Sequence, residues 1–122
     1  MSLLSKYLDP LYNGLLEKHG VFFAFSDSQY EEQAKKGVEY VRLEFGAFAP
    51  KANAKKFIDE SVEAHEEAIK EMKKHNTKDE IILSELFNYE CFYTGDYSQV
   101  IDIVGNYGFN ADDVYNVYRD NL

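Results

Sequence analysis

The sequence contains few of the residues from which disulfides, metal sites and nucleophilic centres are built. Its 122 residues include one cysteine, three histidines, two prolines and no tryptophan. The single cysteine, Cys91, excludes an internal disulfide and is compatible with a reducing compartment. The chain has no His-x3-His or Cys-x2-Cys pair, which are spacings typical of zinc ligands. We therefore expect neither a metal nor another cofactor.

Motifs for nucleotide binding and for hydrolysis are also missing. The chain has no phosphate loop, no Gly-x-Gly-x-x-Gly and no Gly-x-Ser-x-Gly. No apolar run approaches the length of a membrane span, and the N-terminus lacks the basic region and apolar core of a signal peptide. We therefore expect a cytoplasmic protein, and we favour a protein without catalysis over an enzyme.

Positive charge is scarce. The chain has 22 acidic residues against 13 lysines and arginines, which gives a net charge of −9. Proteins bind nucleic acids and anionic membranes by neutralising phosphates with basic residues, so we expect no direct binding to nucleic acid or to a membrane. An acidic surface instead suits solubility, a basic protein partner or cations.

The rest of the composition is that of a folded domain. Hydrophobic residues make up 45% of the chain and charged residues 29%, which are ordinary values for a globular protein. The aromatic share of 16% is high and consists of tyrosine and phenylalanine alone. A chain of this length can bury a core without disulfides, so we expect residues 1–122 to form a single domain.

The first part of the chain alternates between helix and strand patterns. Apolar residues recur at helical spacing over 3–18, where Pro10 either lies inside the helix or marks its first turn. The apolar stretch over 21–25 predicts a short buried strand. A short helix follows, and two pairs have the spacing of a capping box at its start: Ser26 with Gln29, or Ser28 with Glu31. These patterns predict helix, strand and helix in that order.

A second strand is predicted over 38–45. The residues after it, 46–54, form a loop or an irregular third strand, and Gly46 and Pro50 argue against a central position for it in a sheet. The alternation of the second strand places three apolar residues on one face: Val41, Leu43 and Phe45.

The second half of the chain reads as four helices. They are predicted over 57–75, 78–93 and 96–104, and from Asn110 to the end. Thr77 with Glu80 has the spacing of a capping box, and Asp96 and Asn110 are capping residues. The sequence therefore predicts an α+β fold with a small two- or three-stranded sheet packed against a mostly helical C-terminal half. In the first of these helices a narrow apolar seam is expected: Ile58, Val62, His65, Ile69 and Met72.

The stretch ELFNYECFYTGDYSQ, residues 85–99, holds the candidate binding residues. On a helical wheel apolar residues lie on nearly every side of 81–93, which predicts a central helix with Glu85 and Glu90 partly buried and Asn88 on a small polar arc. In the first interpretation Glu85, Asn88 and Glu90 form a site, because acids between apolar walls often do. In the second they are core groups paired with arginine, lysine or a tyrosine hydroxyl.

Two segments of the chain carry a resemblance to known proteins. The residues VFFAFSDSQYEE near the front and NYECFYTGDYSQVIDIV near the end resemble an uncharacterised family of small acidic proteins. That family is associated with phages and mobile elements of gut and Gram-positive bacteria. The resemblance implies no known activity, so it assigns no catalytic residue.

Two functions remain open from the sequence. The first is a small acidic accessory or protein-interaction module without catalysis, since tyrosines such as Tyr107, Tyr115 and Tyr118 suit contact surfaces. Its partner is expected to be a protein, and exposed aromatic residues would favour a homodimer. The second is a small-ligand binder or enzyme that uses Glu85, Asn88 and Glu90, since an acid of raised pKa can transfer protons.

Overall fold

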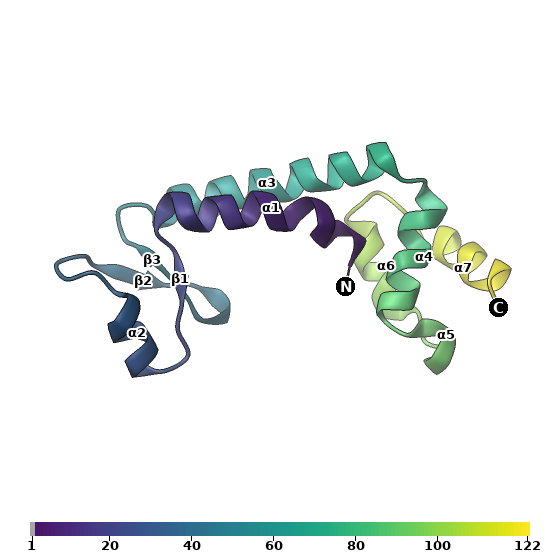
Figure 1. Cartoon of the computed structure of the whole chain (residues 1–122). Helices are drawn as coiled ribbons and strands as arrows, with labels where there is room; N and C mark the ends of the chain where they lie inside the picture. The colour runs from purple at the N-terminus through teal and green to yellow at the C-terminus, as the bar shows by residue number, and fades with distance from the viewer. Residues whose placement is uncertain (1) are drawn as a thin grey trace. The chain divides into compact units, whose positions relative to one another are not determined.

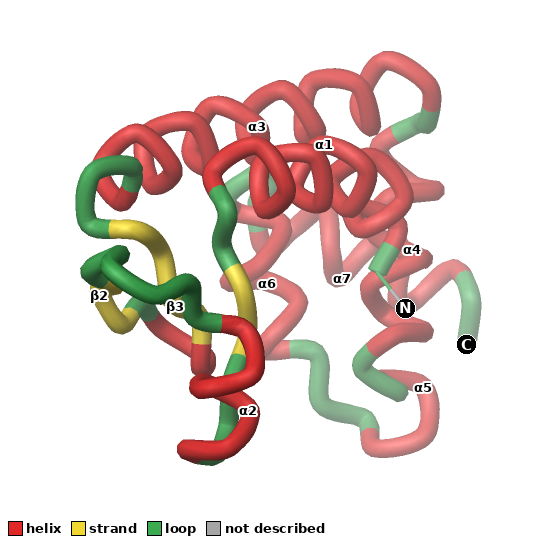
Figure 2. The backbone as a smooth tube through the Cα atoms, turned by 60° about the vertical axis from the view of Figure 1, so that its left-hand side comes forward, coloured by secondary structure: helices red, strands yellow, loops and turns green. Residues whose placement is uncertain are grey.

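The computed structural model describes residues 2–122 (Figure 1, Figure 2). The strands lie in the N-terminal half and helices dominate the C-terminal half, which confirms the predicted α+β class. In chain order the elements are α1 (Leu3–His19), β1 (Phe22–Phe23), α2 (Asp27–Gln33), β2 (Tyr40–Arg42), the 3-10 helix η1 (Glu44–Gly46), β3 (Ala47–Pro50), α3 (Ala54–His75), α4 (Lys78–Asn88), α5 (Cys91–Thr94), α6 (Ser98–Gly105) and α7 (Ala111–Asp120).

The described residues form two compact units. One unit contains the chain up to Leu8 together with Glu67–Leu122, and we call it the helical unit. The other, Asp9–Glu66, contains the strands, and we call it the sheet unit. The helices α1 and α3 each contribute residues to both units. The expectation of a single domain over the whole chain stays a prediction.

The three strands of the sheet unit form an antiparallel sheet in the order β1-β3-β2. One face is buried by α1 and by the start of α3, because small residues of β3 let the helices approach closely. This core contains Val21, Ala47, Ala49 and Phe57, with Tyr12, Leu15, Leu16, Leu43 and Ala54 packed against it.

The other face of the sheet carries a cluster of four aromatic rings, one of them from α2. Their centroids lie between 4.9 and 6.1 Å apart, in tilted, edge-to-face and stacked arrangements that aromatic pairs prefer. Each ring is half-buried, so the cluster is a thin second core that is open on one side. We call these residues the aromatic cluster: Phe22, Tyr30, Tyr40 and Phe48.

Residues 47–50 form the central strand of the sheet, so the prediction that Gly46 and Pro50 exclude a central position was wrong. Leu43 N–H donates to the Ala47 carbonyl at 2.7 Å, and Lys51 N–H donates to the Glu39 carbonyl at 2.9 Å. Because bonding pairs alternate along an antiparallel ladder, the nitrogen of Pro50 points away from β2. On its other side β3 pairs with β1 through its first two residues only. Pro50 therefore costs the sheet no ladder hydrogen bond.

The second strand is shorter than predicted, and Phe45 is not on its buried face. After β2 the chain turns back through Phe45 at φ 59° and Gly46 at φ 79°, and Ala47 N–H bonds to the Glu44 carbonyl. Two consecutive residues with positive φ, closed by this hydrogen bond, form a turn with the φ signs of type I′. The backbone twist of a type I′ turn matches the twist of the two strands of a hairpin. The sequence alternation continues through this turn, but the backbone does not, and the Phe45 side chain is 86% exposed.

The first strand is also shorter than the predicted 21–25. Only Phe22 and Phe23 pair with β3, and Phe25 is exposed. Ser26 caps α2, one of the two alternatives left open by the sequence, since its hydroxyl accepts a bond from Gln29 N–H at 3.2 Å. Pro10 lies inside α1, one of the two alternatives left open by the sequence.

The helical unit packs α4 against α6 and α7 around a closed apolar core. The predicted caps are confirmed for Thr77, which forms a capping box with Glu80, and for Asn110, which forms one with Asp113. Asp96 Oδ1 accepts bonds from the N–H and the hydroxyl of Ser98 at the start of α6. The most deeply buried apolar residues of this core are Ala68, Met72, Ile81, Ile82, Leu86, Cys91, Val100, Val104 and Val114.

Two predictions about the long helices were wrong in part. In α3 Met72 and Ile69 pack inward, but Ile58, Val62 and His65 are exposed. Phe57 and Ala68 of α3 are buried, although neither belongs to the predicted apolar seam. The helix predicted over 78–93 is broken, since α4 ends at Asn88 and α5 begins at Cys91.

Candidate functional site

Glu85 lies inside the helical unit, as the helical wheel predicted. It is 2% exposed, and the Ser2 hydroxyl donates a hydrogen bond to its Oε1 at 2.7 Å. The same hydroxyl accepts a bond from Leu4 N–H at 3.2 Å, so Ser2 joins the start of α1 to α4. A buried carboxylate needs such donors because its desolvation is costly. The donor is a serine, a different residue from the basic or tyrosine partners that we predicted.

A buried phenol lies in the electrostatic field of Glu85. Burial, followed by the charge of Glu85 and by Tyr89, raises the pKa of Tyr107 from its ordinary 10.0 to about 12. Desolvation and a nearby negative charge both disfavour the phenolate, so Tyr107 stays neutral over the physiological range. Its backbone carbonyl accepts a bond from Lys73 Nζ at 2.8 Å. Glu85 and Tyr107 are thus neighbours inside the unit.

The structure places the other two candidate residues in different surroundings. Asn88 is half-buried at the end of α4. The prediction that Glu90 is partly buried was wrong: it is exposed, because α4 ends before it and it lies between α4 and α5. Glu90 has φ 54°, which is uncommon for a residue other than glycine. It lines a surface hollow of about 320 Å³ whose lining includes neither Glu85 nor Asn88. The other residues of this hollow are Phe87, Phe92 and Tyr93.

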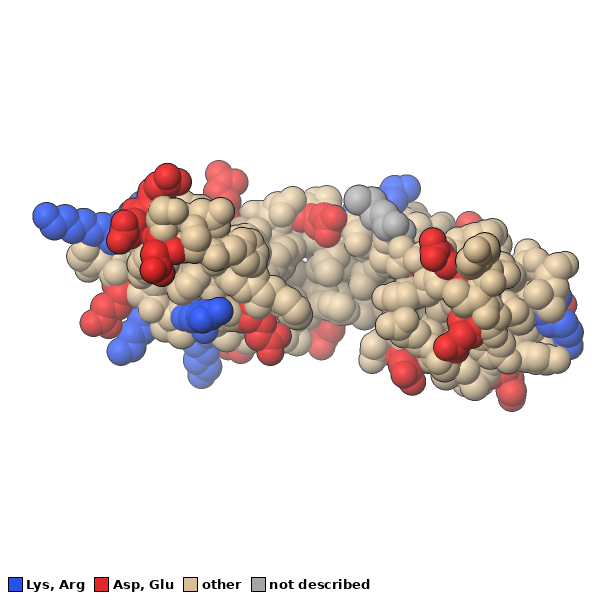
Figure 3. Space-filling view, turned by 90° about the horizontal axis from the view of Figure 1, so that it is seen from below, with Lys and Arg blue, Asp and Glu red and all other residues tan. Residues whose placement is uncertain are grey.

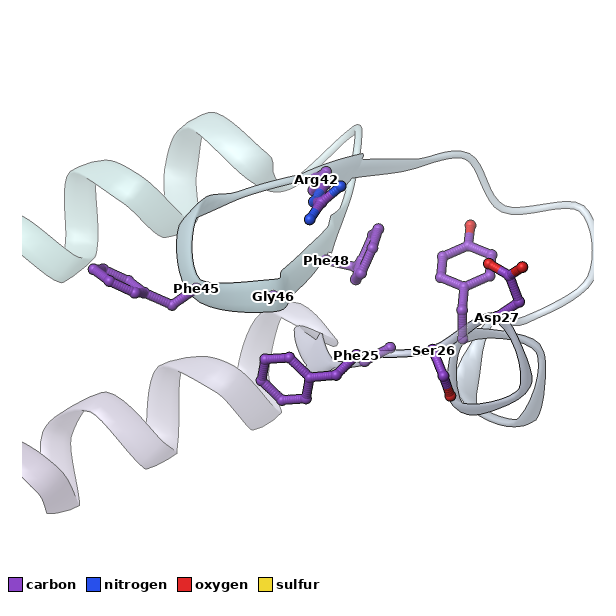
Figure 4. A pocket seen from close by; sticks show the side chains of 9 residues that line it. Phe25, Ser26, Asp27, Arg42, Phe45, Gly46 and Phe48 are labelled. Atoms are coloured by element: carbon purple, nitrogen blue, oxygen red, sulfur yellow. The ribbon is translucent and has the colours of Figure 1, made fainter.

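A larger hollow lies in the sheet unit, beside the aromatic cluster (Figure 4). Its volume is about 600 Å³, and its walls come from the segment after β1, from α2, from β2 and from the turn between β2 and β3. Such a volume falls within the range of pockets that bind small molecules. Its lining residues are Ala24, Phe25, Ser26, Asp27, Tyr30, Arg42, Phe45, Gly46 and Phe48.

Two exposed phenylalanines flank this hollow. Phe25 is 76% exposed and Phe45 is 86% exposed, whereas Phe48, which also lines the hollow, is half-buried. In Figure 4 the Phe45 ring projects from the turn, and Phe25 and Phe48 line the opening. Phenylalanine rings left in water forgo most of the free energy that their burial would supply. We therefore take this hollow, and not the acidic residues of α4, as the candidate functional site.

The local backbone explains why both rings are held outward. Phe45 occupies the first positive-φ position of the turn, where asparagine or glycine is usual. Gly46 occupies the second position, and a Cβ atom there would lie 2.5 Å from the Phe25 ring. The ring of Phe25 can lie against the backbone only because residue 46 is glycine.

The polar groups at the hollow stand at its edge. Arg42 comes from β2 and Asp27 from the first turn of α2, and in Figure 4 they are on different sides of the opening. Ser26 is occupied by its capping bond to Gln29 N–H. The charged residues that line the hollow are therefore Arg42 and Asp27, and the other lining residues are apolar, aromatic, serine or glycine.

A hydrogen-bonded histidine–glutamate pair links α1 and α3 in the sheet unit, and neither residue lines the hollow. His19 at the end of α1 is buried and bonds through Nε2 to Glu60 Oε2 of α3, while Lys18 Nζ bonds to Glu60 Oε1 at 2.8 Å. The bonds from His19 and Lys18 lower the pKa of Glu60 from 4.5 to about 2. His19 also contacts the Phe57 ring edge-on. This pair ties α1 to α3 within the unit.

Within residues 2–122 no three or more histidine, cysteine, aspartate and glutamate side chains gather closely enough to hold a metal ion. In that described range no helix combines the length and the apolar character needed to cross a membrane.

Comparison with known proteins defines the chain at the level of a family. A family model matches residues 4–121, almost the whole sequence, and its description is a family of unknown function (DUF7659). The chain therefore belongs to this family of unknown function. The match confirms the resemblance to an uncharacterised family but shows no association with phages or mobile elements. No curated protein and no solved structure matches the chain.

The sequence interpretation missed the hollow because its lining residues come from separate segments. Phe25 was expected in a buried strand and Phe45 on the buried face of another strand. A signal was nevertheless present: a glycine followed Phe45 between two strand patterns, and glycine at such a place favours a tight hairpin. Glu85, Asn88 and Glu90 stay predicted site residues, which the structure places in three different environments.

Proposed function

We propose that this protein is a small protein-interaction module without catalysis, and that the hollow of the sheet unit is its contact surface. The observation that carries the proposal is the pair Phe25 and Phe45, two exposed rings at the rim of one hollow. Aromatic residues are enriched among the residues that dominate binding energy, above all where they fill or line a pocket.

The conformation of Phe45 supports the same proposal. A residue other than glycine with positive φ costs roughly 1–2 kcal/mol of backbone strain. Here that strain holds an aromatic ring in water, where it gains little packing. A contact surface is a reason to keep such a residue, because the strain is offset when a partner buries the ring. We expect the partner to insert an apolar side chain between the two rings.

The net negative charge of the chain supports the proposed contact surface only weakly. On the face of the sheet unit that Figure 3 displays, lysine and arginine side chains lie among the aspartates and glutamates. A mixed surface of this kind is ordinary for a solvated domain. We therefore base the proposal on Phe25 and Phe45 at the rim of the hollow and not on the net charge.

A cytoplasmic location remains part of the proposal, in keeping with one buried thiol, Cys91.

The test compares captured proteins between matched variants. Tagged wild type, Phe45→Ser, Phe25→Ser and the control Phe87→Ser are used as bait in a nuclease-treated lysate of the source organism. Phe87 is exposed like the other two but lies in the helical unit. We expect a stoichiometric partner with wild type and Phe87→Ser that is lost with Phe45→Ser and Phe25→Ser. A partner that both rim variants retain would refute the proposed surface.

A second candidate function is a small-ligand site at the hollow of the helical unit. The support for it is Glu90, whose backbone is in the left-handed region and whose carboxylate lines this hollow. The other lining residues are aromatic: Phe87, Phe92 and Tyr93. Aromatic faces with a carboxylate suit an ammonium group. Titration with tetramethylammonium, followed by NMR, should shift the Tyr93 and Phe87 signals in wild type and not in Glu90→Gln. Asp102→Asn on α6 is the matched control, and unchanged spectra in wild type would exclude this ligand class.

A further inference from the structure

The two edges of the sheet are protected to different degrees. At the β1 edge, Gln33 Nε2 donates to the Phe23 carbonyl at 2.8 Å, and Gln29 Oε1 accepts from Phe25 N–H at 2.7 Å. Both glutamines belong to α2, so this helix supplies side-chain partners to the outward backbone groups of β1. An unpaired edge strand is a template for another strand, and covering it in this way prevents such pairing.

The β2 edge has no such cover among the described residues 2–122. The ladder bonds at Glu39 and Leu43 show that odd-numbered residues of this segment face β3. The backbone N–H and C=O groups of Tyr40 and Arg42 therefore point away from the sheet. No hydrogen bond from the described part of the chain reaches these four groups. Val41, between them, is exposed.

We propose that β2 pairs with β2 of a second copy of this chain, in an antiparallel register centred on Val41. A two-fold axis through Val41 sets Tyr40 of one copy opposite Arg42 of the other. The outward groups of both residues are then satisfied, by four hydrogen bonds between the copies. The three-stranded sheets of the two copies become one continuous six-stranded sheet. This proposal goes beyond the proposed function: it shares Arg42 with the hollow of the sheet unit but uses neither Phe25 nor Phe45.

The side chains favour this register. Tyr40 and Arg42 lie on the same face of the strand, so each guanidinium is placed beside a tyrosine ring of the other copy, an arrangement that supports a cation–π contact. A register centred on Tyr40 would instead set Arg42 opposite Val38, whose N–H is already bonded to the Lys35 carbonyl. A register centred on Arg42 would set Tyr40 opposite Glu44, where the strand has ended.

Local charge also permits a second copy at this edge. The whole chain carries a net charge of −9, which opposes self-association in general. The segment around β2 differs, since its three basic residues outnumber its two acidic ones: Lys35, Lys36 and Arg42 against Glu39 and Glu44. Two copies that meet at β2 therefore approach through a segment whose basic residues outnumber its acidic ones. The strand is short, so the dimer is expected to be weak and reversible.

Cysteine cross-linking tests the register directly. In the proposed dimer Val41 faces its own copy in a non-hydrogen-bonded pair, where Cα atoms are about 4.5 Å apart, within the range for a disulfide. Val41→Cys should therefore form a covalent dimer under mild oxidation. Val38→Cys is the matched control, because Val38 is exposed to a similar degree but faces Glu44 and not itself. The native Cys91 is buried and should not react.

Proline substitution tests the backbone bonds. Arg42→Pro removes an outward N–H and leaves the bonds between β2 and β3 in place, which an edge strand tolerates. The control Phe23→Pro removes an outward N–H at the covered edge. In sedimentation experiments over rising concentration, wild type and Phe23→Pro should shift from 14.1 kDa toward twice that mass, and Arg42→Pro should not.

The outcomes are distinct from those of the proposed function. Phe45→Ser and Phe25→Ser should dimerise like wild type. If Arg42→Pro fails to fold by circular dichroism, Arg42→Glu replaces it; it keeps the backbone and should raise the dissociation constant about tenfold by loss of two cation–π contacts. A wild type that stays monomeric at every concentration, a dimer that survives both Arg42 variants, or equal cross-linking at residues 38 and 41 would overturn the proposal.

Discussion

The ring of Phe25 lies against the backbone of Gly46, so close that a Cβ atom at residue 46 would stand 2.5 Å from it. Gly46 also has φ 79°, a conformation that residues with a side chain rarely adopt. This one glycine therefore makes the tight turn after Phe45 and leaves space for the Phe25 ring at the rim of the hollow. The shape of the candidate site depends on it.

We predict that Gly46→Ala destabilises the sheet unit by roughly 1–2 kcal/mol, mainly through the strain of alanine at positive φ. The exposed Phe25 ring can swing aside, so the steric cost is smaller, but the rim changes shape and partner capture should weaken. Urea unfolding followed by circular dichroism measures the stability. Gly14→Ala in α1 is the control: no heavy atom lies within 4 Å of its Cβ, and it should stabilise by about 0.5–1 kcal/mol. Equal effects of the two substitutions would contradict the prediction.

The Glu60 carboxylate gives the sheet unit an acid-sensitive contact. Its pKa is lowered from 4.5 to about 2 by the bonds from His19 and Lys18. A group whose pKa is lower in the folded state stabilises the fold above the unfolded pKa, and this contribution is lost as the carboxylate is protonated. We therefore predict that the free energy of unfolding decreases as the pH falls from 4.5 toward 2, with Glu60 responsible for part of the decrease.

A variant series isolates the contribution of Glu60. Glu60→Gln should be less stable than wild type at neutral pH and should show a shallower decrease between pH 4.5 and 2. Glu63→Gln, an exposed position on the same helix, should follow the wild-type curve. Urea unfolding at a series of pH values measures both. If Glu60→Gln loses stability with the wild-type slope, the carboxylate is not held by His19 and Lys18 as the structure has it.

The raised pKa of Tyr107 makes the stability of the helical unit depend on pH in the alkaline range. Because its pKa is raised from 10.0 to about 12, the folded state keeps the phenol proton after the unfolded state has lost it. The contribution of Tyr107 to stability is complete below pH 10 and is lost as the pH rises toward 12. Tyr107→Phe should therefore lose less stability than wild type over this interval, and Tyr115→Phe, at a more exposed tyrosine, should not differ from wild type.

The same phenol reports on Glu85. Glu85→Gln removes the nearby charge, so the pKa of Tyr107 should fall, yet burial should keep it above 10.0. NMR titration of ¹³C-labelled tyrosine, with the signal assigned by Tyr107→Phe, measures this shift. An unchanged Tyr107 pKa in Glu85→Gln would mean that Glu85 is not its ionised neighbour, and would reopen the question of what Glu85 does in the core.

The features that the sequence predicted are those set by short-range chemistry. The capping boxes at Thr77 and Asn110 involve residues three positions apart, so they can be found without knowledge of the fold. The helices α6 and α7, predicted over 96–104 and from Asn110 to the end, follow from helical periodicity. The burial of Glu85 was predicted in the same way, from apolar residues on nearly every side of one helix.

The features that the sequence did not predict depend on pairing between distant segments. Pro50 can lie in the central strand because β1 pairs only with Ala47 and Phe48 of that strand and does not reach Pro50. No local sequence pattern reveals how far this pairing extends. Glu90 interrupts an apolar pattern that continues unchanged from α4 into α5, so periodicity alone joins the two helices. The hollow is lined by residues of α2, of β2 and β3, of the segment after β1 and of the turn between β2 and β3, so Phe25 and Phe45 share it only in the folded sheet unit.

Phe45 allows stability and binding to be separated in a single substitution. Phe45→Asn creates Asn-Gly, the pair that best fits two consecutive positive φ values in a type I′ hairpin turn. Asparagine tolerates the left-handed conformation at less cost than phenylalanine, and the 86% exposed ring loses little packing when it is removed. We predict that Phe45→Asn raises the free energy of unfolding by about 0.5–1 kcal/mol while capture of the partner is lost.

Two controls make this prediction decisive. Phe45→Ser removes the ring without improving the turn, so it should lose the partner with a stability close to that of wild type. Phe87→Asn removes an exposed ring from a helix, where the turn argument does not apply, and should keep the partner. Urea unfolding and quantitative capture are measured on the same preparations. A less stable Phe45→Asn would mean that the ring packs against the sheet unit, and its strained conformation would then be offset by that packing and not by binding.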